Sequence, residues 1–496
     1  MKKMLCFILA AAMMFSITAL AEDSPGGTPP DGFSGTPPEG TPPDGFGGGT
    51  PPDGTPPDGF GGGTPPDGFG GGTPPDGASG GFGGGTPPGG GTSSFEYAAA
   101  TEVTEAAELN SQSFVSETAD ESALLINTAD TVTVTEPAIT KTGDSSGGDN
   151  CNFYGLNAAL LVMGGSTTTI TGGTIETSAS GANGVFSYGG NGGRNGAAGD
   201  GTTVVISDTT IVTDGDGSGG IMTTGGGITY ATNLDVTTSG RSSAAIRTDR
   251  GGGTVVVDGG TYTTNGLGSP AIYSTADITV KNASLVSNLS EGVCIEGMNS
   301  ITLENSDLTA SNTQCNGNAT FHDTIMIYQS MSGDADSGAS SFTMTGGSLT
   351  SLSGHMFHVT NTHAVITLDG IKLSNQGSDI LLSVCDDGWH GASNIAELVT
   401  HNQQLEGTIL VGDNSTLKLT LSDGSTFEGT VSGEIENAKN ELISTEVGSV
   451  SVTLDSTSTW TLTADTWIDA FEGDASRVTG NGYTLYVNGT ALEGIS

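Results

Sequence analysis

The sequence predicts an all-β protein whose main part is a parallel β-solenoid, and three observations support this fold class. A short motif with two apolar positions recurs along the chain, β-branched residues alternate with threonine, and helical spacing is almost absent. The clearest copy of this motif is TVVVDGGTYTTNG at 254–266. In it, Val257 and Tyr262 flank a spacer and a small turn pair.

The motif occurs nine times. We call its first and second apolar residues the first and second anchors, and successive first anchors are 36, 36, 25, 26, 23, 23, 41 and 24 residues apart. The copies are Val134–Ile139, Ile170–Ile175, Ile206–Ile211, Ala231–Val236, Val257–Tyr262, Val280–Leu285, Leu303–Leu308, Met344–Leu349 and Leu368–Leu373. A base period of 23–26 residues with loop insertions is a repeat period. One unit holds about three short strands and cannot bury its own apolar face, so units must stack. At about 4.8 Å per coil, roughly ten to twelve coils predict a rod about 50 Å long.

A second set of apolar runs advances with the first and supports the same repeat. It consists of Phe186, Met222, Ile246, Ile272, Ile295, Ile327 and Phe357. Glycine and asparagine between the runs suit corners that need left-handed backbone conformations. Antiparallel sandwiches, the rival all-β fold, would instead show tight hairpins without a fixed period. We therefore expect a right-handed parallel β-helix.

The chain divides into three predicted segments. Residues 1–21 have a Lys2-Lys3 start, an apolar core and an Ala19-Leu20-Ala21 cleavage site, which is typical of a signal peptide; an uncleaved signal anchor is the alternative. Residues 22–94 repeat TPPDGFGGG and predict a disordered acidic linker. Residues 95–496 form the β-helix domain with terminal caps, and 95–110 is the one stretch that could form a short helix.

The charge balance excludes several partners. The chain has 12 Lys and Arg against 55 Asp and Glu, a formal charge of −43. A nucleic-acid partner and an anionic membrane surface both need clustered cations, so neither is expected. After signal cleavage no run of 18 apolar residues remains to enter a membrane. We expect a secreted protein, extracellular or associated with the cell surface.

Metal and thiol chemistry are weakly represented. The acidic loops Asp214-Gly215-Asp216 and Asp200-Gly201 offer oxygen ligands, so one incidental Ca²⁺ site fits the sequence, but no regular calcium-binding array occurs. No other cofactor is predicted. The cysteines after the signal segment, Cys151, Cys294, Cys315 and Cys385, match no zinc pattern and predict one or two buried thiols and at most one disulfide.

The coil pattern resembles the pectin-lyase-like right-handed β-helix. Stretches such as RTDRGGGTVVVDGG (247–260) and MIYQSMSGDA (326–335) resemble secreted, adhesin-like β-helix proteins of anaerobic bacteria. The resemblance covers about residues 110–490. It implies the fold and leaves activity open, because this fold carries lyases, hydrolases, adhesins and spacers.

Catalytic signatures of that fold are missing from the sequence. Cys385-Asp386-Asp387-Gly388-Trp389-His390-Gly391 is the nearest match to a pectin hydrolase site, but no Gly-His-Gly or Arg-x-Lys follows it. Asp386 and Asp387 are adjacent, so an extended backbone points them to opposite faces. No Ser-His-Asp spacing is visible. A threonine array that faces ice or a mineral is disfavoured because TVTVT (131–135) and TTTIT (167–171) do not recur in register.

The only local concentration of positive charge is SGRSSAAIRTDRGGG at 239–253, which contains Arg241, Arg247, Asp249 and Arg250. Arginine binds carboxylates bidentately, so these four residues are the candidate ligand-binding site for an acidic glycan. The alternative is an Arg–Asp–Arg group that steadies a corner. We expect a non-enzymatic, adhesin-like or glycan-binding protein whose partners are extracellular glycans or cell-surface polymers. The alternative is a polysaccharide lyase or glycoside hydrolase for acidic polysaccharides.

Overall fold

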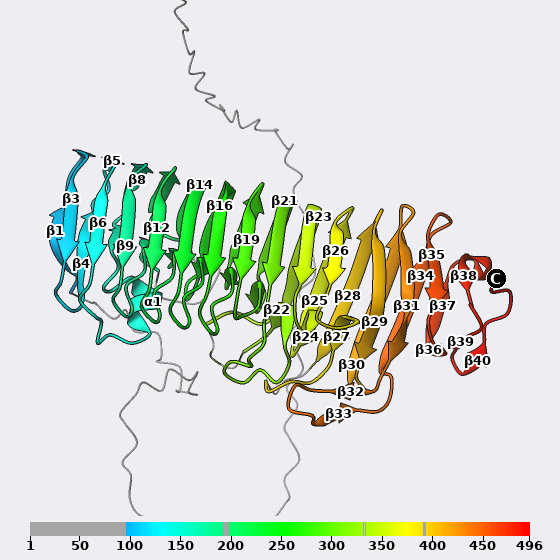
Figure 1. Ribbon diagram of the computed structural model, residues 1–496. Helices are drawn as coiled ribbons and strands as arrows, with labels where there is room; N and C mark the ends of the chain where they lie inside the picture. The colour runs from blue at the N-terminus through cyan, green and yellow to red at the C-terminus, as the bar shows by residue number, and fades with distance from the viewer. Residues whose placement is uncertain (1–95, 192–197, 331, 333, 390–392) are drawn as a thin grey trace, which may run out of the picture. The chain divides into compact units, whose positions relative to one another are not determined.

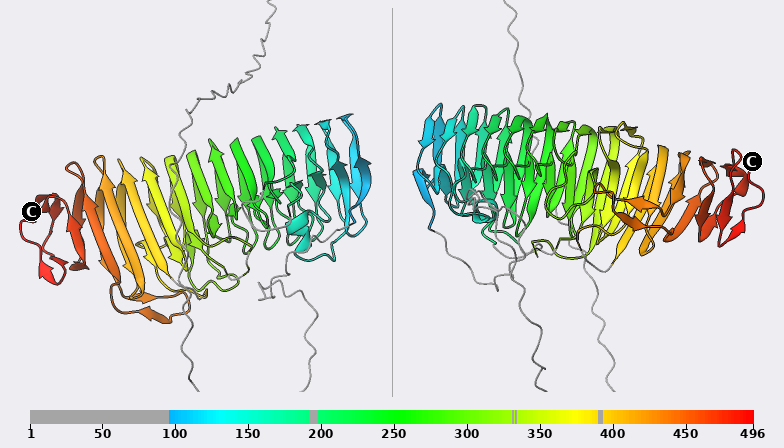
Figure 2. Two further views of the ribbon diagram at one scale, coloured as in Figure 1. Left: turned by 180° about the vertical axis from the view of Figure 1, so that it is seen from behind. Right: turned by 60° about the horizontal axis from the view of Figure 1, so that its bottom comes forward.

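The computed structural model describes residues 96–191, 198–330, 332, 334–389 and 393–496. The predicted signal segment and linker, residues 1–94, lie outside the described residues. The described residues form the predicted parallel β-helix, in which strands from successive coils stack side by side (Figure 1). Two further views show the same stack from behind and from below (Figure 2).

Sheet A contains one strand from each coil, and all of its pairings are parallel. Its fifteen strands are β1 (Ala98–Val103), β4 (Glu121–Asn127), β7 (Leu160–Met163), β10 (Val185–Tyr188), β13 (Ile221–Thr224), β15 (Ile246–Thr248), β17 (Ile272–Ser274), β20 (Val293–Glu296), β22 (Asp323–Tyr328), β24 (His355–Thr360), β27 (Ile380–Val384), β29 (Gln404–Val411), β31 (Thr426–Ser432), β35 (Thr459–Leu462) and β38 (Val478–Thr479). Fifteen strands at about 4.8 Å per step span about 65 Å, so the predicted coil number and length were too small.

Sheet B bends and supplies the other two faces of each N-terminal coil. Its twenty strands are β2 (Ala107–Asn110), β3 (Ser113–Ser116), β5 (Thr131–Thr135), β6 (Ala138–Lys141), β8 (Thr167–Thr171), β9 (Thr174–Thr177), β11 (Thr203–Ser207), β12 (Thr210–Thr213), β14 (Gly227–Thr238), β16 (Gly253–Thr264), β18 (Asp277–Lys281), β19 (Ser284–Ser287), β21 (Ser300–Ala310), β23 (Ala339–Ser351), β25 (His363–Asp369), β26 (Lys372–Asn375), β28 (Asn394–His401), β30 (Ser415–Ser422), β34 (Ser449–Leu454) and β37 (Ala470–Glu472). Within the described residues, β26 is the last strand of the third face, and later coils have two main faces.

The nine-copy register is confirmed at every step. Each first anchor is the Cα partner of the next first anchor, and each second anchor of the next second anchor, from Val134 and Ile139 to Leu368 and Leu373. The first and second anchors are buried, except that Leu373 is half-buried. The corner between them holds a left-handed residue in coil after coil, for example Asn233 (φ 52°), Asn282 (φ 53°) and Asn305 (φ 48°). An asparagine tolerates this conformation, which explains its recurrence.

The second predicted register is wrong in part. Phe186 pairs with Met222, but Met222 pairs with Arg247 rather than Ile246. Likewise, Ile272 pairs with Val293 rather than Ile295. The outer side of sheet A is itself covered by chain segments at several coils, so outward residues such as Leu161, Phe186 and Met222 are apolar like the inward ones, and spacing alone cannot tell the two sides apart.

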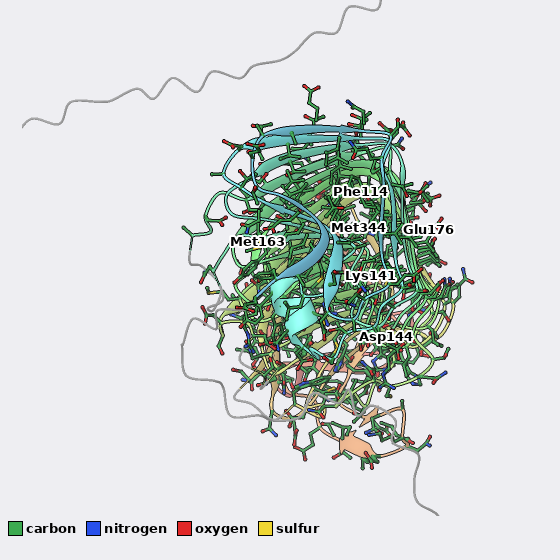
Figure 3. All side chains as sticks on the ribbon, turned by 90° about the vertical axis from the view of Figure 1, so that its left-hand side faces the viewer. Phe114, Lys141, Asp144, Met163, Glu176 and Met344 are labelled. Atoms are coloured by element: carbon green, nitrogen blue, oxygen red, sulfur yellow. The ribbon has the colours of Figure 1, made fainter. Side chains whose placement is uncertain are left out.

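Seen along the stack, the core and the outer faces separate clearly (Figure 3). Phe114 and Met344 lie inside the coils, whereas Met163 and Glu176 lie on opposite outer sides. Within the stretch 95–110, residues 96–110 do not form the short helix that the composition allows, because they contain β1 and β2, which pair with the next coil. The one α-helix of the described residues is α1 (Asn150–Tyr154), and a short 3₁₀ turn, η1, spans Ala475–Arg477.

Two small sheets complete the fold. The antiparallel pair β32 (Ile435–Glu436) and β33 (Leu442–Ser444) projects beside the C-terminal half of the stack (Figure 1). At the C-terminal end, β36 (Thr466–Ile468), β39 (Leu485–Val487) and β40 (Thr490–Ala491) form a separate three-stranded sheet (Figure 1). No helix in the described part of the chain is long and apolar enough to span a membrane.

Candidate functional site

The outer face of sheet A is covered at two places, and a cleft lies between them. Near the N-terminal end, Tyr154 of α1 packs against the outward residues Leu161 and Phe186. Toward the C-terminal end, Phe321 and the β32 residue Ile435 pack against Cys385 and Leu410. The cleft has a cavity volume of about 60 Å³ and opens to solvent, and its lining residues are Ser242, Ala244, Arg247, Gly268, Pro270, Tyr273, Glu291, Cys294, Asn316, Gly317, Ala319, Met326, Tyr328 and Trp389.

Coil stacking explains why residues far apart in sequence share this cleft. Arg247, Tyr273, Cys294 and Met326 are successive Cα partners in β15, β17, β20 and β22. Their side chains therefore point the same way at intervals of about 4.8 Å. The sequence places one such residue in each coil, so the cleft wall is a direct product of the repeat.

Arg247 is held rigidly in this wall. Its Nη2 lies 2.7 Å from Oδ2 of Asp249, its Nη1 donates to the Ser242 carbonyl at 3.0 Å, and its guanidinium carbon lies 5.3 Å from the Tyr273 ring centroid. Its buried Nε has no hydrogen-bond partner among the described residues. Burial lowers the pKa of Arg247, but Asp249 outweighs this effect and the pKa is raised, so the guanidinium is charged. Burial and, to a smaller extent, the nearby Asp334 raise the pKa of Asp249 to about 6 despite the Arg247 partner.

The other two arginines of the predicted site go to different places. Arg250 leaves the cleft: its Nε and Nη2 lie 3.0 and 2.5 Å from Asp334 Oδ1, and its guanidinium carbon lies 4.1 Å from the Phe153 ring centroid. Arg241 lies at the rim, where its Nη2 donates to Asn316 Oδ1 at 3.0 Å. Among the described residues, no carboxylate lies within ion-pair distance of Arg241. The four predicted residues thus do not converge on one ligand position: Arg247 lines the cleft, Arg241 borders it, and Asp249 and Arg250 make structural ion pairs.

Glu296 organises the aromatic part of the cleft. The Tyr273 hydroxyl donates to Glu296 Oε2 at 2.5 Å, and the Tyr328 hydroxyl donates to the same atom at 3.2 Å. Ser330 and Ser332 donate to Oε1. Burial raises the pKa of Glu296 even though these donors lower it, and burial raises the pKa of both tyrosines well above the usual value. The ring of Trp389 lies 4.9 Å from that of Tyr328, so three aromatic rings and one guanidinium surround the cleft.

Glu291 and Asp323 form a second polar group on adjacent coils. Strand pairing places Gly292 beside Thr324, so the two acids occupy equivalent positions. Glu291 lines the cleft, and burial raises its pKa. Asp323 is fully buried, neither carboxyl oxygen has a partner among the described residues, and burial together with Glu291 raises its pKa well above the usual value. A buried carboxyl without a partner is stable in the neutral form, which agrees with this direction.

Sequence reasoning missed a buried series of side-chain contacts that joins a serine, two histidines and an aspartate. The Ser383 hydroxyl lies 2.8 Å from Nδ1 of both His355 and His358, and His358 Nε2 lies 3.3 Å from Asp387 Oδ2. These residues come from β24, β27 and the loop after β27, so no local motif signals them. Ser383 and His358 are fully buried, so a substrate cannot reach them in this conformation. Asp386 is exposed and accepts from Asn394, which confirms that the two adjacent acids point apart.

The described residues show no centre for metal or disulfide chemistry. Across them, no three His, Cys, Asp or Glu side chains are grouped to hold a metal ion. In the loops considered for calcium, Asp216 Oδ1 accepts the Arg241 backbone N–H, and Asp200 Oδ1 accepts from Thr202. All four cysteines within the described residues are free thiols, three of them buried, where at most one disulfide was predicted.

The outer face of sheet B carries rows of hydroxyl groups. Contrary to the sequence-based argument, TVTVT and TTTIT are in register, because Thr131, Thr133 and Thr135 are the Cα partners of Thr167, Thr169 and Thr171. The row through Thr133 is interrupted two and three coils on by the exposed side chains of Val205 and Tyr230. The array is therefore short because its composition changes, and not because its register fails.

Comparisons with known proteins return no match: no family model, no curated protein and no solved structure is similar to this chain at a significant level.

Proposed function

We propose that this chain is a secreted or surface-associated, non-enzymatic, adhesin-like β-helix protein that binds extracellular glycans in the cleft on sheet A. The observation that carries the proposal is the lining of the cleft, which combines Tyr273, Tyr328 and Trp389 with the fixed guanidinium of Arg247. Aromatic rings pack against the C–H faces of sugars, and a few placed polar groups set orientation. The signal-like residues 1–21 and the resemblance to secreted β-helix proteins support secretion.

The cleft favours a glycan that contains a carboxylated sugar. Arg247 is held by Asp249 and by the Ser242 carbonyl and its Nε is buried, so it contributes a positive edge to the cleft wall. Arg241, at the rim, has a guanidinium held only by the neutral Asn316 side chain among the described residues. A carboxylate that approaches Arg241 would gain a charge-assisted hydrogen bond. This contact is the reason to expect an acidic ligand on so acidic a protein.

Calorimetric binding of trigalacturonate and of uncharged hexose oligosaccharides tests the proposal. Trp389→Ala should weaken binding up to about tenfold, because a stacked ring contributes roughly 0.5–1.5 kcal/mol beyond its buried area. Arg241→Ala should weaken trigalacturonate binding about tenfold, as expected for one lost hydrogen bond to a charged group. Lys372→Ala removes an exposed cation from another sheet and should leave binding unchanged. Equal affinity of the wild type and the Trp389 and Arg241 variants would refute the cleft as the binding site.

The second candidate is an enzyme that cleaves acidic polysaccharides, and Glu291 is the observation that favours it. This carboxyl lines the cleft with a raised pKa, as a general acid requires, and Asp323 follows it in the next coil. Incubation with polygalacturonate, followed at 235 nm for unsaturated products and by reducing-end release, separates the two. Product formation that Glu291→Gln abolishes would replace binding with catalysis as the function.

A further inference from the structure

A pair of stacked aromatic rings at the C-terminal end of the fold lies outside the cleft. Trp467 of β36 and Tyr486 of β39 are Cα partners in parallel strands. Their ring centroids are 5.1 Å apart and their planes differ by 4°, so the rings stack face to face. Their neighbours Ile468 and Leu485 are buried in the core, which turns Trp467 outward; its exposed fraction is 49%. An aromatic side chain this exposed, yet fixed by a stacking partner, is preorganised to bind.

The row of stacked aromatic rings ends at Ala491. This residue of β40 is the cross-strand partner of Tyr486, so its side chain occupies the next position of the same row. Ala491 is exposed and Tyr486 is partly exposed. A methyl group cannot cover a phenol ring, so the face of Tyr486 remote from Trp467 is left without a stacking partner on this row. The next position in the row therefore has room for one flat ring.

A polar hollow borders the other aromatic ring. Val447, Gly448, Trp467, Ile468, Asp469, Asn488 and Gly489 line it. Asp469 is anchored, since its Oδ2 accepts the Val450 backbone N–H at 3.0 Å, and Asn488 sits in a left-handed turn at φ 47°. Carboxylate and amide groups next to an aromatic ring supply hydrogen bonds to hydroxyl groups at the edge of a bound ring.

The charge around this end selects an uncharged ligand. Between residues 460 and 496 the chain has five acids and one cation, Arg477. An anionic sugar would be repelled here, unlike at the arginine-containing cleft. We propose that Trp467 and Tyr486 form a second carbohydrate site, which binds the pyranose ring of an uncharged β-linked oligosaccharide. An all-equatorial pyranose is flat and presents C–H groups to the negative face of the ring.

The experiment titrates the full chain with cellohexaose, laminarihexaose and mannohexaose and follows tryptophan fluorescence and heat. At least one hexaose should bind the wild type. Trp467→Ala and Tyr486→Ala should weaken that binding at least tenfold, whereas Tyr486→Phe keeps the ring and should change it less than threefold. Ala491→Trp extends the row with a protein ring and should block the site without removing any existing contact. Tyr483→Ala, which removes an exposed aromatic residue (42%) from the same end of the chain, is the matched control and should bind as the wild type does.

Two results would overturn the proposal. One is a lack of binding to all three hexaoses, or unchanged affinity in both Tyr486→Ala and Ala491→Trp. The other is a concentration-dependent dimer in light scattering that Ala491→Trp abolishes, because a second copy of the chain would then be the occupant. Trp389→Ala changes the cleft and leaves this end of the fold intact. Hexaose binding that is lost in this variant therefore belongs to the cleft, and binding that is kept belongs to the site at Trp467 and Tyr486.

Discussion

His358 Nε2 lies 3.3 Å from Oδ2 of Asp387, and both side chains are completely buried on the outer side of sheet A. The other carboxylate oxygen of Asp387 accepts from the Thr320 backbone N–H at 2.7 Å, from the Thr320 hydroxyl at 2.6 Å and from the Gly388 N–H at 2.6 Å. Phe321 stacks on the His358 ring at 4.6 Å. One carboxylate thus joins the loop 312–322 to the loop that carries Trp389, and both loops border the cleft.

Asp387→Ala should therefore release the loop 312–322 while the coils stay folded. Burial raises the pKa of Asp387, but contacts with His358, Thr320 and Gly388 outweigh it and lower the pKa, so the group is a carboxylate at neutral pH. Removing the buried carboxylate leaves the donors of Thr320 and Gly388 without their acceptor, which costs about 1–3 kcal/mol. Hydrogen exchange measured by mass spectrometry should show peptides across 312–322 exchanging at least about tenfold faster.

Asp386→Ala is the matched control, because Asp386 is the adjacent acid but is exposed and contacts Asn394. Its exchange pattern over 312–322 should equal that of the wild type. The same acceleration in both variants would show that the loop does not depend on the Asp387 carboxylate.

The contrast between the coils and this loop network explains what the sequence could predict. The anchors from Val134 to Leu373 were assigned correctly because stacked coils must repeat their apolar positions at a fixed register. The network of Ser383, His358 and Asp387 has no period, since its members come from separate coils and an inserted loop. The sequence identified Arg247 as unusual because of its charge, but its burial and its ion pair with Asp249 depend on neighbouring coils. For this reason, replacement of Arg247 or Arg250 by alanine should harm folding and does not cleanly test binding.

A second prediction concerns the pH dependence of stability. Burial raises the pKa of Asp323, Glu291, Glu296 and, to about 6, Asp249. In each case the folded protein holds a proton that the unfolded chain releases at lower pH, so the stabilisation is complete below about pH 4 and is lost as pH rises through the folded pKa. The urea midpoint should fall between about pH 4.5 and pH 7.5. For Asp249 alone, a rise of the pKa from 3.8 to about 6 corresponds to about 3 kcal/mol.

Asp323→Asn separates this effect from the general relief of charge repulsion at low pH. The variant keeps the size of the side chain and cannot ionise, so its urea midpoint should fall less steeply with pH and should exceed that of the wild type at pH 7.5. Asp214→Asn makes the same charge change at an exposed position and should keep the slope of the wild type. A slope that Asp323→Asn leaves unchanged would assign the pH dependence to net charge alone.

A third prediction concerns the glycine column at the corner beside Arg241. A Cβ on Gly240 would lie 1.8 Å from the Gly215 carbonyl oxygen, and a Cβ on Gly266 would lie 1.8 Å from the Gly240 carbonyl oxygen. Backbone atoms of adjacent coils cannot separate without breaking strand pairing, so Gly240→Ala should cost about 2–3 kcal/mol. Urea unfolding followed by circular dichroism measures this loss. Gly147→Ala, whose Cβ would meet no atom closer than 3.2 Å, should cost much less, and equal losses would contradict the steric explanation.

The last prediction uses the corner that follows the first anchor of each copy. Glu136 occupies the left-handed position there at φ 48°, where other coils have Asp208, Asn233 or Asn282. Glutamate gains no local compensation for this conformation, whereas asparagine adopts it readily. Glu136→Asn should therefore stabilise the protein by about 0.5–1 kcal/mol. It loses the exposed contact between Glu136 Oε2 and the Gly173 N–H at 3.1 Å, which contributes little in water.

The reciprocal change Asn282→Glu should destabilise by at least as much, because it also removes the hydrogen bond of Asn282 Nδ2 to Asp258 Oδ1 at 2.7 Å. Thermal melts of both variants check the pair, and shifts of the same sign would refute backbone conformation as the cause.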